Sequence, residues 1–358
     1  MRDEDQLIQR IARAVPSVTG RTGDSHGLVL GIGDDAAVFS SRPGQQWVIS
    51  CDAFMEGVHF VAEIHPADSI GYKALVRAAS DLVAMGAAPR LFLLTLAVPP
   101  TRTGPWLDQF LRGMRRAAKY LDVRLAGGDT TTSTTVSISI TVLGQIESAD
   151  QTGRTHTRHA RNEGGRAQPL TRSGGRPGDK IYVSGTLGRA QIGLDLIRRW
   201  KKTIGTAAKA MQEMLPAHLY PRLRVELGRW LARNSVASAM MDLSDGLSSD
   251  LTRLCRASGV GAKLYAERIP AVSASPSLLK LLPRWFDPLT AALHGGDDYE
   301  LLFTVPAANE RRLRAAPDSS ELTCIGKLMR DRHIVLVGTD GKATPLRPAG
   351  WDPFRKSG

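Results

Sequence analysis

The chain has 358 residues, of which 42% are hydrophobic and 23% are charged, and its formal net charge is +12. This length suggests about two domains, and the composition excludes general disorder. Only three cysteines are present and they are widely spaced, which excludes a disulfide framework and a structural zinc site.

The first half of the chain alternates helical and extended patterns. Residues 4–15 are amphipathic and lack the apolar core of a signal peptide, and no run of about 18 apolar residues occurs anywhere. We therefore expect an opening helix there, in a cytoplasmic protein that binds no membrane. Apolar residues at helical spacing predict a helix over 67–85. The other elements expected in this half are an extended segment at 36–40, strands at 47–52, 91–98 and 135–144, a helix at 106–120, and a short strand that runs into the sequence AGGDTT at 126–131.

A basic segment rich in glycine and arginine separates the two halves. Residues 151–178 contain six arginines and one acid, which is typical of a solvated connector. We expect an N-terminal α/β domain over 1–148, a connector over 149–178, and a C-terminal α/β domain over 179–358.

The second half begins a new alternation of strands and helices. We expect strands at 180–185, 237–242, 299–305 and 322–328, and helices over much of 187–215, near 222–233 and over 245–257. Neighbouring extended segments follow one another in the manner of hairpins. This order favours an α+β fold of mixed layers over a doubly wound parallel sheet.

Aspartate recurs beside glycine, serine or threonine where apolar strands end. The segments are GDD at 33–35, SCD at 50–52, GGDT at 127–130, DLSDG at 242–246 and GGDD at 295–298, and Asp81 lies among apolar neighbours inside a predicted helix. Any one of them could be a turn or a helix cap, as Asp245 could be for the helix that follows it. If they converged, each pair about 4 Å apart would repel by a few kcal/mol at an effective dielectric of about 20. The repeated pattern therefore predicts a site for an oxygen-bound cation such as Mg²⁺, which commonly also binds substrate phosphates.

The segment GIGDDAAVF at 31–39 also fits the loose dinucleotide fingerprint G-x-G-x-x-A. That fingerprint requires a helix after the loop, whereas AAVFS has an extended pattern and two carboxylates would face the phosphates. The usual phosphate loop and the protein-kinase signatures are absent from the sequence. We therefore prefer a metal-binding role for this loop, with Asp35 as the ligand and Asp34 shaping the turn.

Seven segments, taken in order, resemble the thiamine-monophosphate kinases: GIGDDAAVF, SCDAFMEGVHF, SDLVAMGAAP, GGDTT, LTRSGGRPGD, MDLSDGLSSDL and GGDDYELLF. That family belongs to the ATP-binding superfamily of aminoimidazole ribonucleotide synthetase. The resemblance implies a two-domain α+β fold, a homodimer formed through the N-terminal sheet, and ATP bound in a cleft. It also implies Mg²⁺-dependent transfer of the ATP γ-phosphoryl group to thiamine monophosphate, which gives thiamine diphosphate and ADP in the last step of thiamine diphosphate synthesis.

The resemblance also assigns roles to residues of this sequence. The metal ligands it implies are Asp35, Ser50, Cys51, Asp52, Asp81, Asp129, Asp242 and Asp245. The ATP-binding residues it implies are Tyr120, Gly128, Asp129, Arg172 and Ser244, and the substrate-binding residues are His59, Asp297 and Trp351. Relatives commonly carry threonine at position 51 and glutamate at position 297. Because a thiol is a poor Mg²⁺ ligand, Cys51 could contribute only its backbone carbonyl.

Several alternatives stay open at this point. His59 could be a buried hydrogen-bonding histidine, and Trp351 could be a packing residue rather than an aromatic face for a substrate cation. The chain could be another ATP-dependent enzyme of the superfamily, although it lacks the reactive cysteines of the selenophosphate and hydrogenase-maturation members. The basic charge also permits a nucleic-acid-binding protein, which we consider unlikely. We expect no catalytic general base, because a phosphate acceptor is already anionic near neutral pH.

Overall fold

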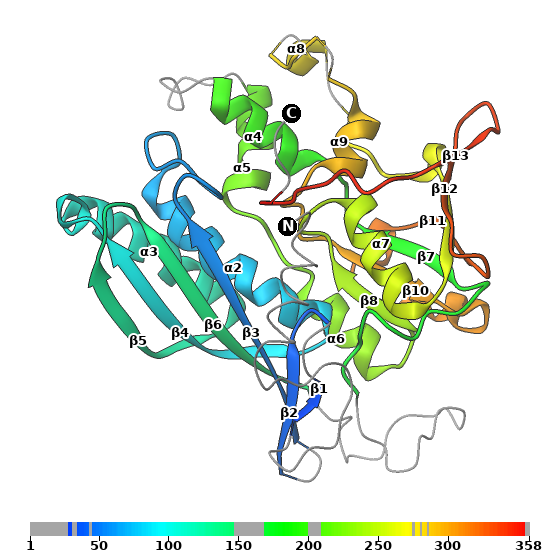
Figure 1. Cartoon of the computed structure of the whole chain (residues 1–358), viewed down its shortest axis with the longest axis horizontal. Helices are drawn as coiled ribbons and strands as arrows, with labels where there is room; N and C mark the ends of the chain where they lie inside the picture. Colours follow the sequence, from blue (N-terminus) through cyan, green and yellow to red (C-terminus); the bar gives the residue numbers. More distant parts are fainter. Residues whose placement is uncertain are drawn as a thin grey trace.

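The structure is a computed structural model that describes residues 28–30, 34–42, 45–146, 168–199, 209–273, 276–279, 281–284 and 286–354. The helix expected at 4–15 and most of the basic connector lie outside the described residues. Figure 1 shows two β-sheets side by side, one from each half of the chain, with helices packed between and around them.

The N-terminal half forms a six-stranded sheet in the order β1-β2-β3-β6-β4-β5. Its strands are β1 (Leu28–Leu30), β2 (Ala37–Arg42), β3 (Gln45–Met55), β4 (Ala88–Val98), β5 (Arg124–Thr132) and β6 (Ser137–Ile146). β4 and β5 are parallel, and the other neighbouring strands are antiparallel. A short 3-10 helix, η1 (Pro100–Arg102), follows β4.

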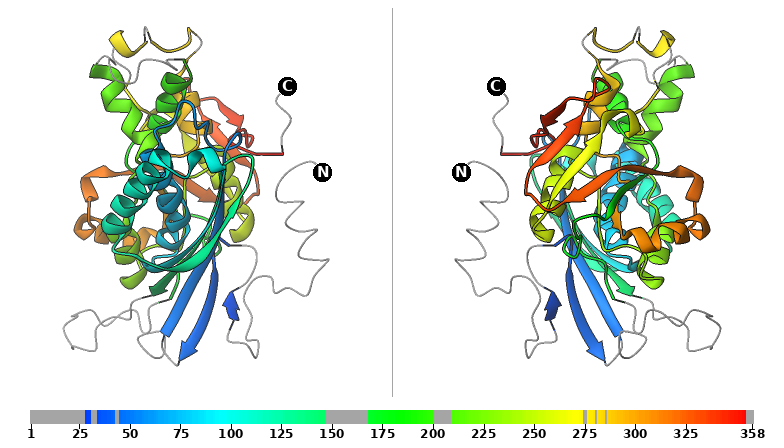
Figure 2. Two further views of the ribbon diagram at one scale, coloured as in Figure 1. Left: turned by 90° about the vertical axis from the view of Figure 1, so that its left-hand side faces the viewer. Right: turned by 90° about the vertical axis from the view of Figure 1, so that its right-hand side faces the viewer.

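Two helices, α2 (Ala67–Ala84) and α3 (Pro105–Leu121), cover one face of this sheet (Figure 2). α3 is amphipathic and buries one stripe that includes Phe110 and Met114. α2 is buried on nearly all sides, because it packs against the N-terminal sheet and also against β8, α5 and α6 of the second half. The polar residues of α2 therefore lie between the two halves.

The C-terminal half forms a seven-stranded sheet in the order β13-β12-β9-β11-β7-β10-β8. Its strands are β7 (Lys180–Ser184), β8 (Ala239–Asp242), β9 (Gly261–Tyr265), β10 (Leu301–Val305), β11 (Leu322–Met329), β12 (Ile334–Val337) and β13 (Ala343–Pro345). β9 and β12 are parallel and the other pairs are antiparallel. The helices of this half are α4 (Arg189–Arg199), α5 (Lys209–Leu219), α6 (Val225–Arg233), α7 (Leu247–Ser258), α8 (Pro276–Leu279) and α9 (Pro288–His294), with 3-10 helices η3 (Ala266–Arg268), η4 (Ala307–Ala315) and η5 (Ser319–Glu321).

The predicted α+β class is confirmed, and the long helices and strands agree with the apolar patterns that predicted them. Short elements were missed, namely β1, β9, β12, β13, α8 and α9. The alternative role of Asp245 as a helix cap is wrong. The residue before α7 is Gly246, and the carboxylate of Asp250 accepts hydrogen bonds from the backbone N–H groups of Asp245 and Gly246 at 3.1 and 3.0 Å.

The largest apolar core extends across both halves. Leu75 and Phe92 of the first half belong to the same buried cluster as Leu227 and Phe303 of the second. The proposed boundaries at residues 148 and 178 stay predictions, because this shared core packs the halves as one body. Within the described part of the chain, no helix combines the length and apolarity needed to cross a membrane.

Candidate active site

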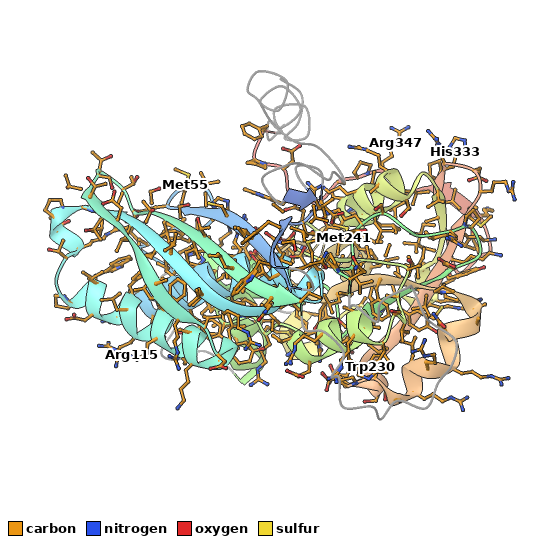
Figure 3. The ribbon with its side chains drawn as sticks, turned by 90° about the horizontal axis from the view of Figure 1, so that it is seen from below. Met55, Arg115, Trp230, Met241, His333 and Arg347 are labelled. Carbon is orange, nitrogen blue, oxygen red and sulfur yellow. The ribbon has the colours of Figure 1, made fainter. Side chains whose placement is uncertain are left out.

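A cavity of about 410 Å³ opens between the two halves. One wall comes from β3, the segment after it and α2. The other comes from α4, the end of β8, the loop before β10 and the C-terminal segment that runs back from β13 to the centre of the molecule (Figure 1). In Figure 3 the N-terminal sheet, which carries Met55, and the C-terminal sheet meet near Met241 of β8. The cavity lies where distant parts of the sequence converge.

Three predicted metal ligands converge at one point beside this cavity. Asp35, Asp81 and Asp242 each place a carboxylate oxygen within 4.8 Å of the other two. They come from the turn before β2, from α2 and from the last residue of β8. Ser50 donates a hydrogen bond to Asp81, and Ser80 Oγ donates to Asp242 Oδ2 at 2.5 Å. The two serines fix the carboxylates while leaving other oxygen lone pairs open.

Burial and mutual repulsion perturb these acids strongly. Burial raises the pKa of Asp242 to about 7, and the negative charge of Asp35 adds to this rise. The pKa of Asp81 is raised well above its usual value by burial and then by the charges of Asp242 and Asp35. Such a group is unfavourable as three anions and becomes favourable when a cation is shared among them.

The residues present fit a hard divalent cation. The ligands that converge are all oxygen atoms, as Mg²⁺ prefers. Asp35 Oδ2 is buried and has no hydrogen-bond partner among the described residues. A buried carboxylate oxygen without a donor costs free energy that a bound cation would recover.

The C-terminal end of the basic connector reaches this cluster. Arg172 Nη2 donates to Asp35 Oδ1 at 2.6 Å, and the backbone N–H of Arg172 lies 3.2 Å from each carboxylate oxygen of Asp34. Asp34 also accepts from the backbone N–H of Asp35 at 3.0 Å, and its pKa is raised to about 7 by burial and then by the charge of Asp35. These contacts agree with the prediction that Asp34 shapes the loop.

Two further predicted ligands line the cavity and are paired with arginines. Asp52 pairs with Arg77, whose Nε donates to Asp52 Oδ2 at 2.5 Å. Asp245 pairs with Arg253, which also contacts Asp250 at 2.8 Å. Asp250 was not predicted, and its buried carboxylate organises the DLSDG loop through the two backbone bonds described above.

All three predicted substrate residues line the same cavity. The ring centroids of His59 and Trp351 are 6.5 Å apart. His59 Nδ1 accepts a hydrogen bond from Met55 N at 3.0 Å, which leaves the proton on Nε2, and burial lowers the pKa of His59 to about 4. Trp351 is 42% exposed, so its ring is not buried in the core. Asp297 is held by Lys73 and by Tyr299.

Four predicted site residues lie away from this cavity in the single chain. Gly128 and Asp129 lie on β5, whose residues are all exposed. The Tyr120 hydroxyl contacts the backbone of Leu223, donating to its oxygen at 3.0 Å and accepting from its nitrogen at 3.1 Å. The Cys51 thiol is exposed and points toward Ser139 and Thr141 of β6. The roles of these four residues stay predictions.

Two cations of α2 were missed by the sequence analysis, namely Arg77, which lines the cavity, and Lys73, which is buried behind Asp297. Lys73 and Arg77 precede Asp81 by eight and four residues, so the three side chains share one face of the helix. A polar stripe on an otherwise apolar helix was visible in the sequence and could have identified them.

Comparison with known proteins gives a consistent result. The N-terminal domain family of AIR synthase related proteins matches residues 33–146, and the corresponding C-terminal domain family matches residues 176–338. Thiamine-monophosphate kinase of Escherichia coli K12 is 36% identical over 330 residues, covering 91% of this chain and 92% of the relative. The enzyme of Bacillus subtilis is 31% identical, covering 95% and 98%.

Solved structures agree with these relatives. The structure of AaThiL complexed with AMPPCP and TMP has a TM-score of 0.78 and 28% identity, and covers 98% of this chain and 96% of that one. Thiamine-monophosphate kinase from Stenotrophomonas maltophilia K279a has a TM-score of 0.70 and 36% identity, with 95% and 98% covered. Hydrogenase maturation protein HypE, at 18% identity and a TM-score of 0.63, shares the fold.

Proposed function

Because the chain belongs to the thiamine-monophosphate kinase family of AIR synthase related proteins, we propose that it transfers the γ-phosphoryl group of ATP to thiamine monophosphate. The products are thiamine diphosphate and ADP. The observation that carries this proposal is the convergence of buried carboxylates with the predicted substrate residues in one cavity.

Asp35, Asp81 and Asp242 would hold Mg²⁺, and Asp52, Asp245 and the oxygens at Ser50 and Cys51 are further candidate ligands. When bound, Mg²⁺ supplies charge neutralisation and alignment of the two phosphate groups for in-line transfer. The protein's own cations assist at the same place, because Arg77 lines the cavity and Arg172 lies on Asp35. Arg172 Nε is buried and has no hydrogen-bond partner among the described residues.

The chain supplies positioning rather than a general base. The nucleophile is an oxygen of the acceptor phosphate, which is already anionic near neutral pH. What limits the uncatalysed reaction is bringing two polyanions together in line, and the cavity meets that need with Arg77 and with carboxylates that can hold cations, all of which line it. No residue is assigned as a catalytic base.

The organic part of the acceptor would lie against His59, Asp297 and Trp351. The thiazolium ring carries a positive charge, which an indole face and a carboxylate both attract. His59 is neutral and presents Nε2–H as a donor. These three residues give the cavity a preference for a cationic, aromatic acceptor.

The nucleotide roles of Gly128, Asp129, Tyr120 and Ser244 are part of this proposal, and so is a homodimer. The face of the N-terminal sheet opposite α2 and α3 exposes Met55 and Leu93, and β5 forms an uncovered edge of the sheet. A second copy on this face would shield the apolar side chains and the edge.

We also propose a cytoplasmic location, which suits an ATP-using enzyme with three free cysteines.

The direct test is to incubate the protein with Mg-ATP and thiamine monophosphate and to identify the product by mass. Thiamine diphosphate and ADP should form in equal amounts, and unphosphorylated thiamine should yield no phosphorylated product. Asp129→Asn should abolish turnover without loss of fold, whereas Asp340→Asn, at an exposed turn between β12 and β13, should leave turnover unchanged. Folded, ATP-binding protein that forms no thiamine diphosphate would refute the assignment.

A further inference from the structure

A buried polar network lies directly behind the predicted substrate residue Asp297. Lys73 is only 3% exposed, and its Nζ donates to Asp297 Oδ2 at 2.8 Å and lies 3.2 Å from His218 Nδ1. His218 is 1% exposed, and its Nε2 lies 3.1 Å from His65 Nε2. A buried lysine is unusual and requires partners of this kind.

The chemistry of the donors gives the network one direction. A charged lysine can only donate, so His218 Nδ1 accepts and the proton of His218 is on Nε2. His218 Nε2 faces His65 Nε2, and His65 Nδ1 in turn lies 2.9 Å from Val61 O and 3.1 Å from the backbone nitrogen of Val61. Both imidazoles are neutral, since burial lowers the pKa of His65 to about 4 and lowers that of His218 well below its usual value.

The network ends in the segment that carries His59. Val61 lies two residues after His59, between β3 and α2. The chain of bonds therefore connects Asp297 of the second half, through Lys73 of α2 and His218 of α5, to the segment of the first half that presents another substrate residue. Substrate residues from both halves are held by one set of hydrogen bonds.

The other side of Asp297 is fixed as firmly. Tyr299 Oη donates to Asp297 Oδ1 at 2.8 Å, and both residues adopt the left-handed backbone conformation, with φ of 69° and 51°. That conformation is uncommon for residues with side chains and persists where the surroundings impose it. Between them, Asp298 accepts from the backbone N–H groups of Gly188 and Ala190 at 2.7 and 3.2 Å, which anchors the loop to the start of α4.

We propose that Lys73 is a positioning residue that acts through Asp297, holding this carboxylate ionised and in place for the cationic organic part of the acceptor. The inference rests on the proposed function and adds a residue to which no role was assigned. Lys73 is almost inaccessible, whereas the Asp297 side chain is 25% exposed toward the cavity. Lys73 thus supports Asp297 from the buried side, and Asp297 itself contacts the acceptor.

The charges around Asp297 support this role. Burial alone would raise the pKa of Asp297, but the positive charges of Lys73 and Arg77 lower it below its usual value, while the neutral His218 lies 3.6 Å from Asp297 Oδ2. Tyr299 faces the same carboxylate as a neutral donor. Without Lys73, much less would oppose the increase that burial causes in the pKa of Asp297. Asp297 would then take up a proton at a higher pH. A protonated Asp297 would lose its attraction for a cation.

The test compares Lys73→Met, Asp297→Asn and the double variant, with Lys119→Met on exposed α3 as the control. Lys73→Met should raise the KM for thiamine monophosphate about tenfold or more and change kcat and the KM for ATP less than threefold. Its KM for thiamine monophosphate should rise further as the pH falls from 8 to 6, whereas wild type should show no such rise from this group. Calorimetric titration of thiamine monophosphate without ATP gives a second readout.

The double variant decides whether Lys73 works through Asp297. If it does, adding Lys73→Met to Asp297→Asn should cause no further loss of acceptor affinity. This comparison remains informative even if Lys73→Met alone folds poorly, because the double variant leaves no unpaired buried charge. Multiplicative effects, or equal losses in kcat and in both KM values, would overturn the proposal. Failure of wild type to form thiamine diphosphate would instead overturn the proposed function.

Discussion

Arg77 Nε donates to Asp52 Oδ2 at 2.5 Å, and Arg77 Nη2 lies 3.3 Å from Asp52 Oδ1. The guanidinium therefore occupies both oxygens of a carboxylate that the family resemblance assigns to metal. Arg77 and a metal ion at Asp52 are both cations, so each weakens the binding of the other. Arg77 also lines the cavity, where it can contact a phosphate group.

Arg77→Gln should tighten divalent metal binding in the absence of nucleotide by about tenfold. Two like charges separated by about 6 Å repel by about 3 kcal/mol at an effective dielectric of about 20, and solvent screening reduces this to about 1.4 kcal/mol, or tenfold. Mn²⁺ binding followed by electron paramagnetic resonance measures the affinity directly. The same variant should lower kcat because a phosphate partner is lost. Unchanged Mn²⁺ affinity would show that no metal site lies near Asp52.

The metal-free protein should lose stability as the pH rises from about 4 to about 7. Burial raises the pKa of Asp242 from 3.8 to about 7, and the pKa of Asp81 is raised for the same reason. Between these pH values the folded state binds protons that the unfolded chain has released, so the free energy of unfolding decreases with rising pH. The contribution of Asp242 is fully present below about pH 4 and is lost as the pH rises through about 7, and Asp81 contributes in the same direction.

Mg²⁺ should reverse this loss, because it replaces the protons among the three carboxylates. Thermal melting with and without Mg²⁺ measures the effect, and the increase in Tm should be greater at pH 8 than at pH 5.5 by at least about 3 °C. Asp81→Asn should remove most of the increase at pH 8. An increase in Tm that does not depend on pH would contradict a site built on Asp81 and Asp242.

The sequence predicted the parts of the fold that have a strong local pattern. α2 was predicted over 67–85 and is observed as Ala67–Ala84, because apolar spacing over about five turns overrides local irregularities. β1, β9, β12 and β13 were missed and have only three to five residues each, although β7, β8 and β10 are as short and were predicted. Length alone therefore does not explain these misses.

The GGDT motif shows a second limit of prediction from the sequence. It was expected where a strand ends, but β5 continues through it to Thr132. Gly128 permits this because a Cβ atom there would lie 1.8 Å from the backbone oxygen of Leu94 on the neighbouring strand. The glycine marks close approach of two strands rather than a turn. That distinction depends on the neighbour, which the local sequence does not contain.

The acidic ligands were predicted as a set, but their partners were not. Aspartate beside small residues is visible in the sequence. The repulsion expected among converging carboxylates indicated the need for a cation. The pairing of Arg172 with Asp35 joins residues 137 positions apart, and the Lys73 contact with Asp297 joins residues 224 positions apart. Such contacts follow from the packing of the two halves against each other, which no local pattern specifies.

Trp351→Ala should raise the KM for thiamine monophosphate about tenfold and change the KM for ATP less than twofold. A cation–π contact in a partly desolvated site contributes about 1 to 2 kcal/mol, which corresponds to about tenfold in affinity. The ring lines the cavity beside His59, and the Trp351 backbone N–H donates to Asp245 O at 2.9 Å, which does not require the side chain. Steady-state kinetics with each substrate varied in turn separates the two constants. An equal rise in both would contradict a ring that contacts the acceptor.

Leu93→Glu should convert a dimer of this protein into a monomer. Leu93 is 41% exposed on the open face of the N-terminal sheet, together with Met55. A stable interface on this face would bury about 1,200 Å² or more, and a charge near its centre would be desolvated without a partner. Sedimentation velocity at micromolar concentration should give twice the monomer mass for wild type and the monomer mass for the variant. Leu111→Glu is the matched control, because Leu111 is 42% exposed but lies on α3, across the sheet from the open face. A monomeric wild type, or dissociation by both variants alike, would rule out this face as the dimer interface.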